Sequence, residues 1–342
     1  MIVELALNSE RKAARALIEA SALTFEDKVD VMYGVYEAGQ LVATGSRAGN
    51  ILKMLAVAPE HQGGAVLGEL VTALVTDGLR ADHDSLFIYT KPEYILSFQA
   101  LNFTLLAHQE KAALLEYGKG LAAWLESRRP LIREGVNGAV VVNCNPFTNG
   151  HLYLIENAAR QVDHLYVFVV REDRSVFPFD VRYRLVEQGV RHVANVIQLD
   201  TSNYIVSGAT FPTYFLKKDE PIARIQMELD VSLFAAKIAP FFGITRRFVG
   251  TEPNCPLTGG YNQAMQEILP VYGIDLQIVE RKQTDSGVIS ASRVREMLGR
   301  GDFATLAGYV PPTTLTYLQS DAAEPIRQRL QQDYRNTPLS GS

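Results

Sequence analysis

The second half of the chain alternates short apolar runs with helical patterns, and this alternation constrains the fold more than any other feature. In chain order, the apolar runs are GAVVVN, HLYVFVV, NVIQLD, RRFVG and DLQIVER. Helical patterns over Leu152–Val162 and Asp180–His192 separate the first three runs. Apolar strands that alternate with helices form parallel sheets through right-handed crossover connections. We therefore predict a parallel sheet covered by helices, which is an α/β fold.

The first half has a different pattern, in which β-rich runs are separated by glycine-containing turns. A helical pattern over Glu10–Ala20 precedes three apolar runs that are broken at Ala38-Gly39 and at Ala48-Gly49-Asn50. Short breaks of this kind favour antiparallel hairpins, so the three strands should form a meander. A helical pattern over AVLGELVTALVTDGLR then leads to a further strand, SLFIYT. These features predict an α+β domain that is separate from the parallel sheet.

The length of the chain and one polar segment indicate where the two patterns meet. At 342 residues the chain is longer than one typical core, and about 150 residues per domain gives roughly two domains. The segment ESRRPLIREG is polar and contains a proline, which is typical of a linker. We therefore predict one domain over residues 1–132 and a second over residues 133–342.

Charge and apolar patterning disfavour several classes of partner. The net charge of −5 argues against nonspecific binding to nucleic acid or to an anionic membrane. Charged residues interrupt the N-terminal apolar run, and no run of about 18 apolar residues follows, so neither a signal peptide nor a spanning helix is expected. Cys144 and Cys255 lack the spacing of a disulfide framework or a metal site. We predict a cytoplasmic protein with reduced thiols and no nucleic-acid or membrane partner.

The turn after the first predicted parallel strand carries the strongest local signal for ligand binding. In VVVNCNPFTNGHLYLIENAAR, residues 140–160, the strand leads through PFTNGH directly into a helix. Ligands bind at the carboxyl edge of a parallel sheet, and a helix start offers unpaired backbone N–H groups to an anion. The candidate phosphate-binding residues of this turn are Asn145, Pro146, Phe147, Thr148, Gly150 and His151. The alternative from spacing alone is a capped helix whose histidine has no ligand.

A second stretch near the C-terminal end has the same kind of chemistry. In GVISASRVREMLGRGD, Ser290 and Ser292 stand at the start of a predicted helix, and Arg295 follows one turn later. Serine hydroxyls at a helix start can donate to phosphate, while the guanidinium adds a fixed charge with a fork of donors. The sequence thus predicts two helix starts that bind anions.

The ordered pair of TxGH, in the first strand-to-helix turn, and ISxSxxR resembles the nucleotidyltransferase superfamily of adenylyltransferases over roughly residues 138–318. The stretch FVGTE, which contains Gly250 as a further nucleotide-binding candidate, adds to this resemblance. The resemblance implies a Rossmann-like fold that uses ATP with Mg²⁺. It also implies that the histidine stabilises the α-phosphate during attack and that the serine-arginine motif holds the β- and γ-phosphates. We therefore expect His151 and Arg295 to be catalytic, and we expect no protein-built metal site because no carboxylate cluster accompanies the motifs.

The first half of the chain resembles the GNAT acetyltransferase fold in two stretches, AVAPEHQGGAVLGELV and SFQALNF. In that fold a glycine-rich loop at a helix start holds the pyrophosphate of coenzyme A. Gln62, Gly63 and Gly64 match the beginning of the loop motif, while Ala65 and Leu67 depart from it. The resemblance therefore leaves open whether the first domain binds acetyl-CoA, another CoA-like arm, or no ligand.

The combination of both halves, with the strings SVFPFDVRYRLVEQGV and TSNYIVSGATFPTYFLKK, resembles the citrate lyase ligase family. That resemblance implies an enzyme that uses ATP to convert acetate into acetyl-adenylate. It further implies transfer of the acetyl group to the thiol of a CoA-like prosthetic group on the citrate lyase acyl carrier subunit. Gln62, Gly63 and Gly64 are then candidates for binding this acceptor arm.

Two other functions remain open from the sequence. One is a small-molecule adenylyltransferase of the phosphopantetheine or mononucleotide type, and the other is a nucleotide-sensing protein without catalysis. Among secondary candidates, Tyr204, Ser207 and Thr210 are possible ligands of acetate or nucleotide. Arg182 is predicted to be solvated or ion-paired on an amphipathic helix, and Cys144 to be a small packing residue.

Overall fold

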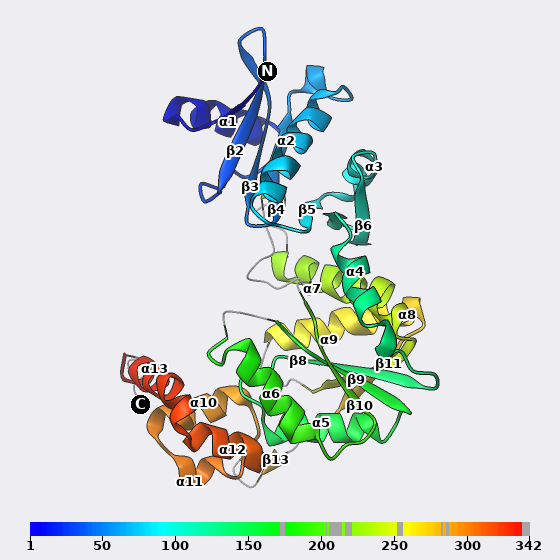
Figure 1. The fold of residues 1–342 in the computed structure, drawn as a ribbon, viewed down its shortest axis with the longest axis vertical. Coiled ribbons are helices and arrows are strands. Elements are labelled where there is room, and N and C mark those ends of the chain that lie inside the picture. The colour runs from blue at the N-terminus through cyan, green and yellow to red at the C-terminus, as the bar shows by residue number, and fades with distance from the viewer. Residues whose placement is uncertain are drawn as a thin grey trace. The chain divides into compact units, whose positions relative to one another are not determined.

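The chain folds into two compact units in a computed structural model (Figure 1). The described residues are 1–171, 175–202, 204, 214–215, 221–251, 256–281, 283–284 and 287–336. The first unit contains Met1–Arg129 and Val206–Lys237, and the second contains Pro130–Ile205 and Ile238–Ser342. The chain first passes between the units inside the predicted linker, and Val206–Lys237 clusters with the first unit although the sequence groups it with the second.

The first unit is built on a seven-stranded sheet with the order β1-β2-β3-β4-β5-β7-β6. Its strands are β1 (Ile2–Glu4), β2 (Val31–Glu37), β3 (Gln40–Ala48), β4 (Ile51–Val57), β5 (Leu86–Thr90), β6 (Phe103–His108) and β7 (Ala113–Tyr117). Strands β2, β3 and β4 pair antiparallel, which confirms the predicted meander. Its breaks hold residues of positive φ, at Ala38, Gly39 and Gly49, as tight turns require.

Four helices from the first part of the chain and one from the returning segment complete this unit. They are α1 (Asn8–Ala20), α2 (Val66–Arg80), α3 (Ile95–Gln99), α4 (Gly120–Ser127) and α7 (Ile222–Leu233). The apolar stripe of α2, with Val66, Leu70 and Leu74, packs on the buried side chains of β4 and β5. Helix α7 lies against β6, the edge strand of the sheet. The predicted α+β domain is therefore confirmed, with α7 as an addition.

The second unit is built on a five-stranded sheet with the order β10-β9-β8-β11-β12, in which every neighbouring pair is parallel. Its strands are β8 (Asn137–Val142), β9 (His164–Val169), β10 (Val196–Asp200), β11 (Ile244–Gly250) and β12 (Asp275–Val279). Helices α5 (Asn149–Ala159) and α6 (Phe179–Val190) connect the first three strands and lie against the sheet (Figure 1). The strand order reverses between β8 and β11, and ligands of open parallel sheets bind at such a reversal.

The rest of the second unit is mostly helical. Its helices are α8 (Ala239–Phe241), α9 (Pro256–Ile268), α10 (Ala291–Arg300), α11 (Phe303–Leu306), α12 (Pro312–Gln319) and α13 (Glu324–Asn336), and the two-residue strands β13 (Gln283–Thr284) and β14 (Gly287–Val288) form a separate hairpin. Across both units, short 3₁₀ helices lie at Pro59–His61, Pro92–Tyr94, Arg129–Leu131, Leu269–Tyr272 and Asp321–Ala323, and a π-helix lies at Phe234–Ile238. Val294, Leu298 and Leu318 are part of a second core that α10 to α13 share. This core fixes the C-terminal helices to one another.

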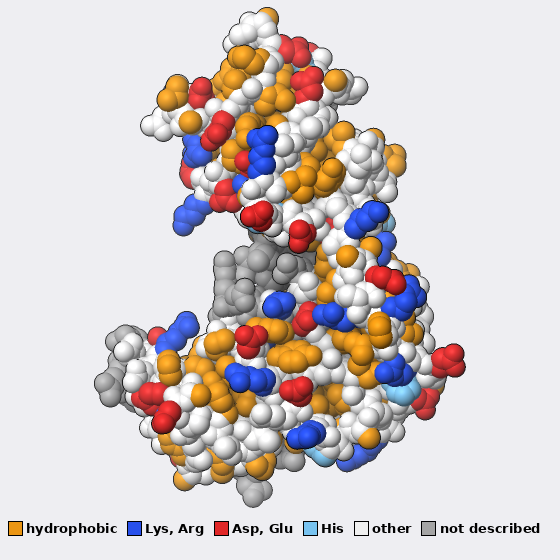
Figure 2. Space-filling view, in the orientation of Figure 1, with side chains coloured by type: hydrophobic (Ala, Val, Ile, Leu, Met, Phe, Trp, Pro, Cys, Tyr) orange, Lys and Arg blue, Asp and Glu red, His pale blue; other side chains and the backbone are white. Residues whose placement is uncertain are grey.

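The predicted α/β fold with two different sheets is confirmed, and the surface agrees with the weak net charge. On the face shown in Figure 2, basic and acidic side chains of the described residues are interspersed. Among the helices of the described ranges, none is long and apolar enough to cross a membrane.

Candidate active site

The turn between β8 and α5 is held rigidly by buried residues on both sides. Cys144 has a positive φ of 51°, and the peptide bond between Asn145 and Pro146 is cis. Phe147 is fully buried, and a Cβ on Gly189 would lie 2.3 Å from its ring, so only glycine fits there. The side-chain oxygen of Asn145 accepts a hydrogen bond from the N–H of Phe177 at 2.9 Å. This packing sets the direction in which the following helix start points.

Thr148 and His151 form a reciprocal cap at the start of α5. The hydroxyl of Thr148 accepts a hydrogen bond from the N–H of His151 at 3.3 Å, and the N–H of Thr148 donates to Nδ1 of His151 at 3.1 Å. The Thr148 hydroxyl also lies 2.9 Å from the same Nδ1. Because Nδ1 acts as an acceptor, the proton of the neutral imidazole belongs on Nε2. His151 thus has one donor left for a ligand.

The charge state of His151 is set by its surroundings. Burial, together with the positive charge of Arg281, lowers the pKa of His151 to about 4. The ring also stacks on Phe147, with centroids 6.0 Å apart and planes inclined by 14°. At neutral pH the side chain is therefore an uncharged, oriented donor, and it lies outside the apolar stripe of α5 as the sequence predicts.

The serine-arginine stretch lies directly against this turn. Arg295 on α10 donates from Nη1 to the backbone carbonyl of Asn145 at 2.6 Å and from Nη2 to the hydroxyl of Ser292 at 3.1 Å. A Cβ on Gly150 would lie 3.3 Å from the carbonyl oxygen of Ile289, which explains the glycine. The hydroxyl of Ser290 caps α10 by accepting from the N–H of Arg293 at 3.2 Å. The structure thus brings the two predicted motifs together.

Arg281 is a basic residue of this site that the sequence analysis did not single out. It follows β12 at the carboxyl edge of the sheet, and its N–H donates to the hydroxyl of Thr251 at 3.2 Å. A Cβ on Gly250 would lie 3.9 Å from its Cγ, so the side chain runs past the end of β11. Partial burial lowers the pKa of Arg281, and its charge acts on His151. The sequence feature that could have identified Arg281 is its position just beyond the last parallel strand.

Arg182 corrects a prediction, because it is fully buried and not solvated on a helix surface. Its Nε donates to the carbonyl of Phe177 at 3.0 Å, and its Nη1 donates to the carbonyls of Asn143 at 2.7 Å and Val170 at 2.8 Å. These carbonyls lie at the carboxyl ends of β8 and β9 and before α6. Hydrogen bonds of a charged donor to several carbonyls offset the cost of burying the guanidinium. Arg182 therefore links the carboxyl ends of β8 and β9, where the candidate site lies.

The candidate residues for the acceptor arm lie in the first unit. Gln62, Gly63 and Gly64 follow β4 and precede α2, and the side-chain amide of Gln62 donates to the carbonyl of Val57 at 3.1 Å. Gly63 has a φ of +77°, and a Cβ on it would meet no atom within 4 Å. The loop is therefore open beside the helix start.

The remaining sequence candidates divide into buried residues and residues outside the described ranges. Tyr204 is buried, while Ser207, Thr210 and Cys255 lie outside the described residues. Cys144 is buried and its thiol pKa is raised by desolvation, which suits the predicted packing residue and not a nucleophile.

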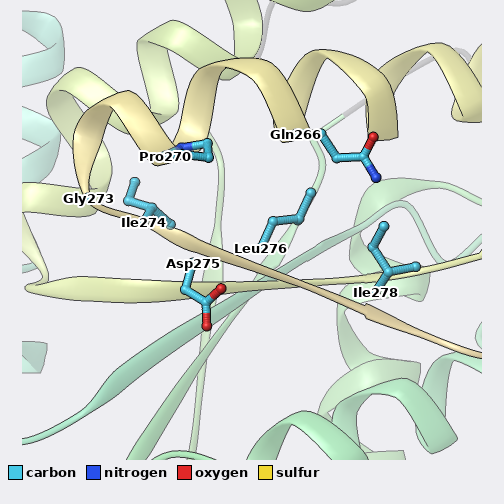
Figure 3. A pocket seen from close by; sticks show the side chains of 7 residues that line it. All are labelled: Gln266, Pro270, Gly273, Ile274, Asp275, Leu276 and Ile278. Carbon is cyan, nitrogen blue, oxygen red and sulfur yellow. The ribbon is translucent and has the colours of Figure 1, made fainter.

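A pocket of about 430 Å³ lies elsewhere in the second unit, beside the edge strand β12 (Figure 3). It is lined by Gln266, Pro270, Gly273, Ile274, Asp275, Leu276 and Ile278. None of the residues that we predict to bind phosphate lines it. In the described part of the chain, no group of three His, Cys, Asp or Glu side chains could hold a metal ion.

A parallel sheet whose reversal point carries a capped glycine-histidine turn and an adjoining serine-arginine helix start defines a domain of the nucleotidyltransferase type. The family model described as the citrate lyase ligase C-terminal domain matches residues 137–318. A citrate (pro-3S)-lyase ligase of Haemophilus influenzae is 38% identical over 317 residues, which cover 89% of this chain and 94% of that protein. The corresponding ligase of Escherichia coli is 37% identical, with 92% and 91% covered. The chain belongs to the citrate (pro-3S)-lyase ligase family.

Other similarities are shorter or weaker. A phosphopantetheine adenylyltransferase of Streptococcus sanguinis is 39% identical over 61 residues, which cover 17% of this chain and 37% of that protein. The structure of Thermotoga maritima TmcAL bound with alpha-thio ATP covers 55% of this chain and 56% of that one, at 14% identity and a TM-score of 0.34. The ribosomal-protein-S18-alanine N-acetyltransferase of Escherichia coli covers 34% of this chain and 92% of its own, at 13% identity and a TM-score of 0.30. The fold assignment rests on the sheets themselves and not on these two structures.

Proposed function

We propose that this chain is an ATP-dependent ligase that converts acetate into acetyl-adenylate, releases pyrophosphate, and then acetylates the thiol of the prosthetic group on the citrate lyase acyl carrier subunit. The observation that carries the proposal is the hydrogen bond from Arg295 to the carbonyl of Asn145. This bond joins the serine-arginine helix start to the glycine-histidine turn, so that donors from both motifs can meet one triphosphate. The names and coverage of the related ligases support the choice of reaction.

The residues of the site suit a nucleotide triphosphate chain. Arg295 and Arg281 supply positive charge, the start of α5 supplies backbone N–H groups, and His151 supplies one neutral N–H. Asn145, Pro146, Phe147, Thr148 and Gly150 shape the turn, while Gly250, Ser290 and Ser292 border it. Partial burial lowers the pKa of Arg295, but a guanidinium remains charged at neutral pH.

The chemistry needs charge stabilisation more than it needs a covalent enzyme intermediate. A carboxylate oxygen of acetate attacks the α-phosphorus, the bond to the bridging oxygen breaks, and the electron pair leaves with pyrophosphate. Nε2–H of His151 donates to a non-bridging oxygen of the α-phosphate as its charge grows. Arg295 neutralises the leaving pyrophosphate. An oriented neutral histidine suits this role because it needs no proton transfer to act.

The proposal includes Mg²⁺ as an ion that the nucleotide binds. Bound to the nucleotide, the ion would neutralise part of the charge of the phosphates. The side chains described here beside the turn are neutral or cationic donors, which suit phosphate oxygens and not the metal itself. We therefore assign no protein ligand to the ion.

The second half of the reaction transfers acetyl from the adenylate to a thiol. The thiolate attacks the acetyl carbonyl, the bond to the adenylate oxygen breaks, and AMP leaves. We assign the acceptor arm's phosphates to the open loop of Gln62, Gly63 and Gly64, since its helix start offers N–H groups and its glycines leave room.

Acetate-dependent exchange of radiolabelled pyrophosphate into ATP tests the first step without the protein partner. We expect exchange with acetate and none with phosphopantetheine or a mononucleotide. Exchange that requires phosphopantetheine would instead favour the small-molecule adenylyltransferase, to which a similarity over only 61 residues points. ATP binding without any exchange would favour a nucleotide sensor.

A further inference from the structure

The first residue of α5, Asn149, is hydrogen-bonded twice to the C-terminal part of the second unit. Its backbone N–H donates to the carbonyl of Tyr309 at 2.9 Å. Its side-chain Nδ2 donates to the carbonyl of Gly308 at 3.0 Å, across 159 sequence positions. The N–H of a first helical residue has no partner within its own helix, so it is available for such a bond. Asn149 therefore ties the start of α5 to the connection between α11 and α12.

That connection packs against α10, which carries the serine-arginine motif. The ring of Tyr309 is buried in the core that α10 to α13 share, together with Val294 and Leu298 of α10. The guanidinium of Arg293, also on α10, lies over the same ring at 5.3 Å from its centroid. Because protein cores are close-packed, a displacement of one member is transmitted to its neighbours. Bonds that fix the position of Tyr309 therefore also restrain α10.

The turn before α5 is thus held to the C-terminal helices at both of its ends. At the first end, Arg295 donates to the carbonyl of Asn145, and at the last end Asn149 bonds to the connection between α11 and α12. Between these ends lies Thr148, whose reciprocal cap orients the ring of His151. Two separate contacts restrict the rotation of α10 more than one contact does. The bonds of Asn149 are therefore placed to control the spacing between His151 and Arg295.

We propose that Asn149 is a positioning residue, which keeps the Nε2–H of His151 and the guanidinium of Arg295 at the spacing that the transition state requires. Asn149 acts through these two residues and does not itself contact the nucleotide. A displacement of about 1 Å in a catalytic group can slow a reaction by about 10²-fold, so a partial loss of restraint should be measurable. This inference deepens the proposed function and rests on it.

Replacing Asn149 by proline removes both hydrogen bonds and keeps the helix. Proline suits the first helical position, because its missing N–H would have no partner within the helix. The residue before a proline must be extended, and Thr148 already is, with a φ of −122° and a ψ of 165°. Asn149→Ala is the milder variant, since it removes only the side-chain donor. The matched control is Asn157→Ala, which removes an amide that donates to the carbonyl of Tyr153 at 2.8 Å within α5.

Hydrogen exchange of the full-length chain without nucleotide tests whether Asn149 restrains α10. Peptides that cover α10 should exchange at least about threefold faster in Asn149→Pro than in the unaltered chain, because one of two contacts with the turn is lost. Peptides that cover β9 should exchange at the same rate in both proteins, and Asn157→Ala should behave like the unaltered chain throughout. Equal exchange at α10 in Asn149→Pro and in the unaltered chain would overturn the proposal.

Acetate-dependent pyrophosphate exchange tests whether this restraint matters to the reaction. The maximal exchange rate per ATP-binding site, with sites counted by calorimetry, should fall by about tenfold in Asn149→Pro and by a few-fold in Asn149→Ala. The affinity for ATP should change by less than about threefold, because the bonds of Asn149 matter most in the transition state. Asn157→Ala should exchange like the unaltered chain. A normal rate per site in Asn149→Pro would contradict the proposal.

A double-mutant cycle with Arg295→Lys separates positioning from direct contact with the nucleotide. If Asn149 acts through Arg295, then Asn149→Pro should lower the rate by less than about threefold once Arg295→Lys is present. A further loss of about tenfold would show that Asn149 acts independently of Arg295, and the proposal would be wrong. An unaltered chain without any acetate-dependent exchange would refute the proposed function, while hydrogen exchange at α10 would still support or contradict the restraint by Asn149.

Discussion

Two strand-to-helix turns of this molecule both contain glycine and histidine but have different surroundings. The turn between β8 and α5 has a reciprocal cap between Thr148 and His151, and it receives Arg295 from a distant helix. The turn between β4 and α2 has glycines, but its N-cap is Ala65, which makes no side-chain cap hydrogen bond. Its histidine, His61, pairs with Glu37 at 3.8 Å. A glycine-rich helix start thus becomes a candidate catalytic site when cations from elsewhere in the chain converge on it.

Replacing His151, in the turn between β8 and α5, should cause the largest loss of activity. His151→Ala should lower acetate-dependent pyrophosphate exchange by about 100-fold or more, because one donor to the developing charge is lost. Circular dichroism and thermal unfolding should show a folded protein. His192→Ala is the matched control, since His192 pairs with Glu156 at 2.8 Å on an exposed part of the same unit. Exchange at the normal rate in folded His151→Ala would remove this residue from the mechanism.

The depressed pKa of His151 predicts how stability depends on pH. The folded pKa of about 4 lies below the usual 6.5, so the unfolded chain binds the proton more readily between these values. Stability from this residue is fully present above about pH 6.5 and is lost as pH falls toward 4. Urea unfolding at pH 7 and pH 5 should therefore show a pH-dependent loss about 2 kcal/mol larger in the unaltered chain than in His151→Gln. Equal losses in both proteins would place the pKa of His151 near its ordinary value.

Replacing the arginine that joins the two motifs should have a smaller effect if its charge is kept. In Arg295→Lys the ammonium cannot hold both the carbonyl of Asn145 and the hydroxyl of Ser292 in the geometry of a guanidinium fork. We expect pyrophosphate exchange to fall by about tenfold. Arg300→Lys on the same helix alters a residue paired with Glu296 on the surface and should leave exchange unchanged. A similar loss in both variants would mean that the effect comes from the helix and not from the site.

The smallest effect is expected at the turn of the first unit, and only in the second half-reaction. Gly64 has ordinary contacts for an added Cβ, with 3.6 Å to the carbonyl oxygen of His61, so Gly64→Asp should fold. Its carboxylate should repel the arm's phosphates and reduce acetylation of the carrier thiol several-fold. Pyrophosphate exchange by the same variant is the internal control and should not change. A normal rate of carrier acetylation would mean that this loop does not hold the arm.

The parts of the fold that follow from local pattern were predictable, and the parts that depend on distant contacts were not. Alternating strands and helices predicted the parallel sheet, and the motif pair predicted that His151 and Arg295 would lie together. Arg182 was misread because an arginine on an amphipathic helix has the same sequence signature whether it meets water or buried carbonyls. Arg281 was missed because it reaches the site only through the pairing of β12 with β11, which brings its side chain beside Gly250.

The unit to which the segment Val206–Lys237 belongs also could not be predicted from local sequence pattern. Residues 206–237 follow β10 in sequence, yet Tyr214 and α7 pack in the first unit. No local pattern indicates that the Tyr214 hydroxyl will donate to the carbonyl of Tyr89 in a distant sheet. A fragment that begins near residue 133 would separate this segment from its partner strands, so substitutions in the full chain are the better way to assign roles to the two units.

The hydrogen bond from Arg295 to the carbonyl of Asn145 also has a consequence for biosynthesis. Its two ends are 150 positions apart, so the turn after β8 leaves the ribosome long before the arginine that completes it. Closing so long a loop is slow compared with forming the local turn and the neighbouring helix. The nascent chain should therefore acquire its parallel sheet first and its full affinity for a triphosphate only once α10 has been made. A chain that stops before α10 would keep the glycine-histidine turn and Arg281 but would lack the charge of Arg295.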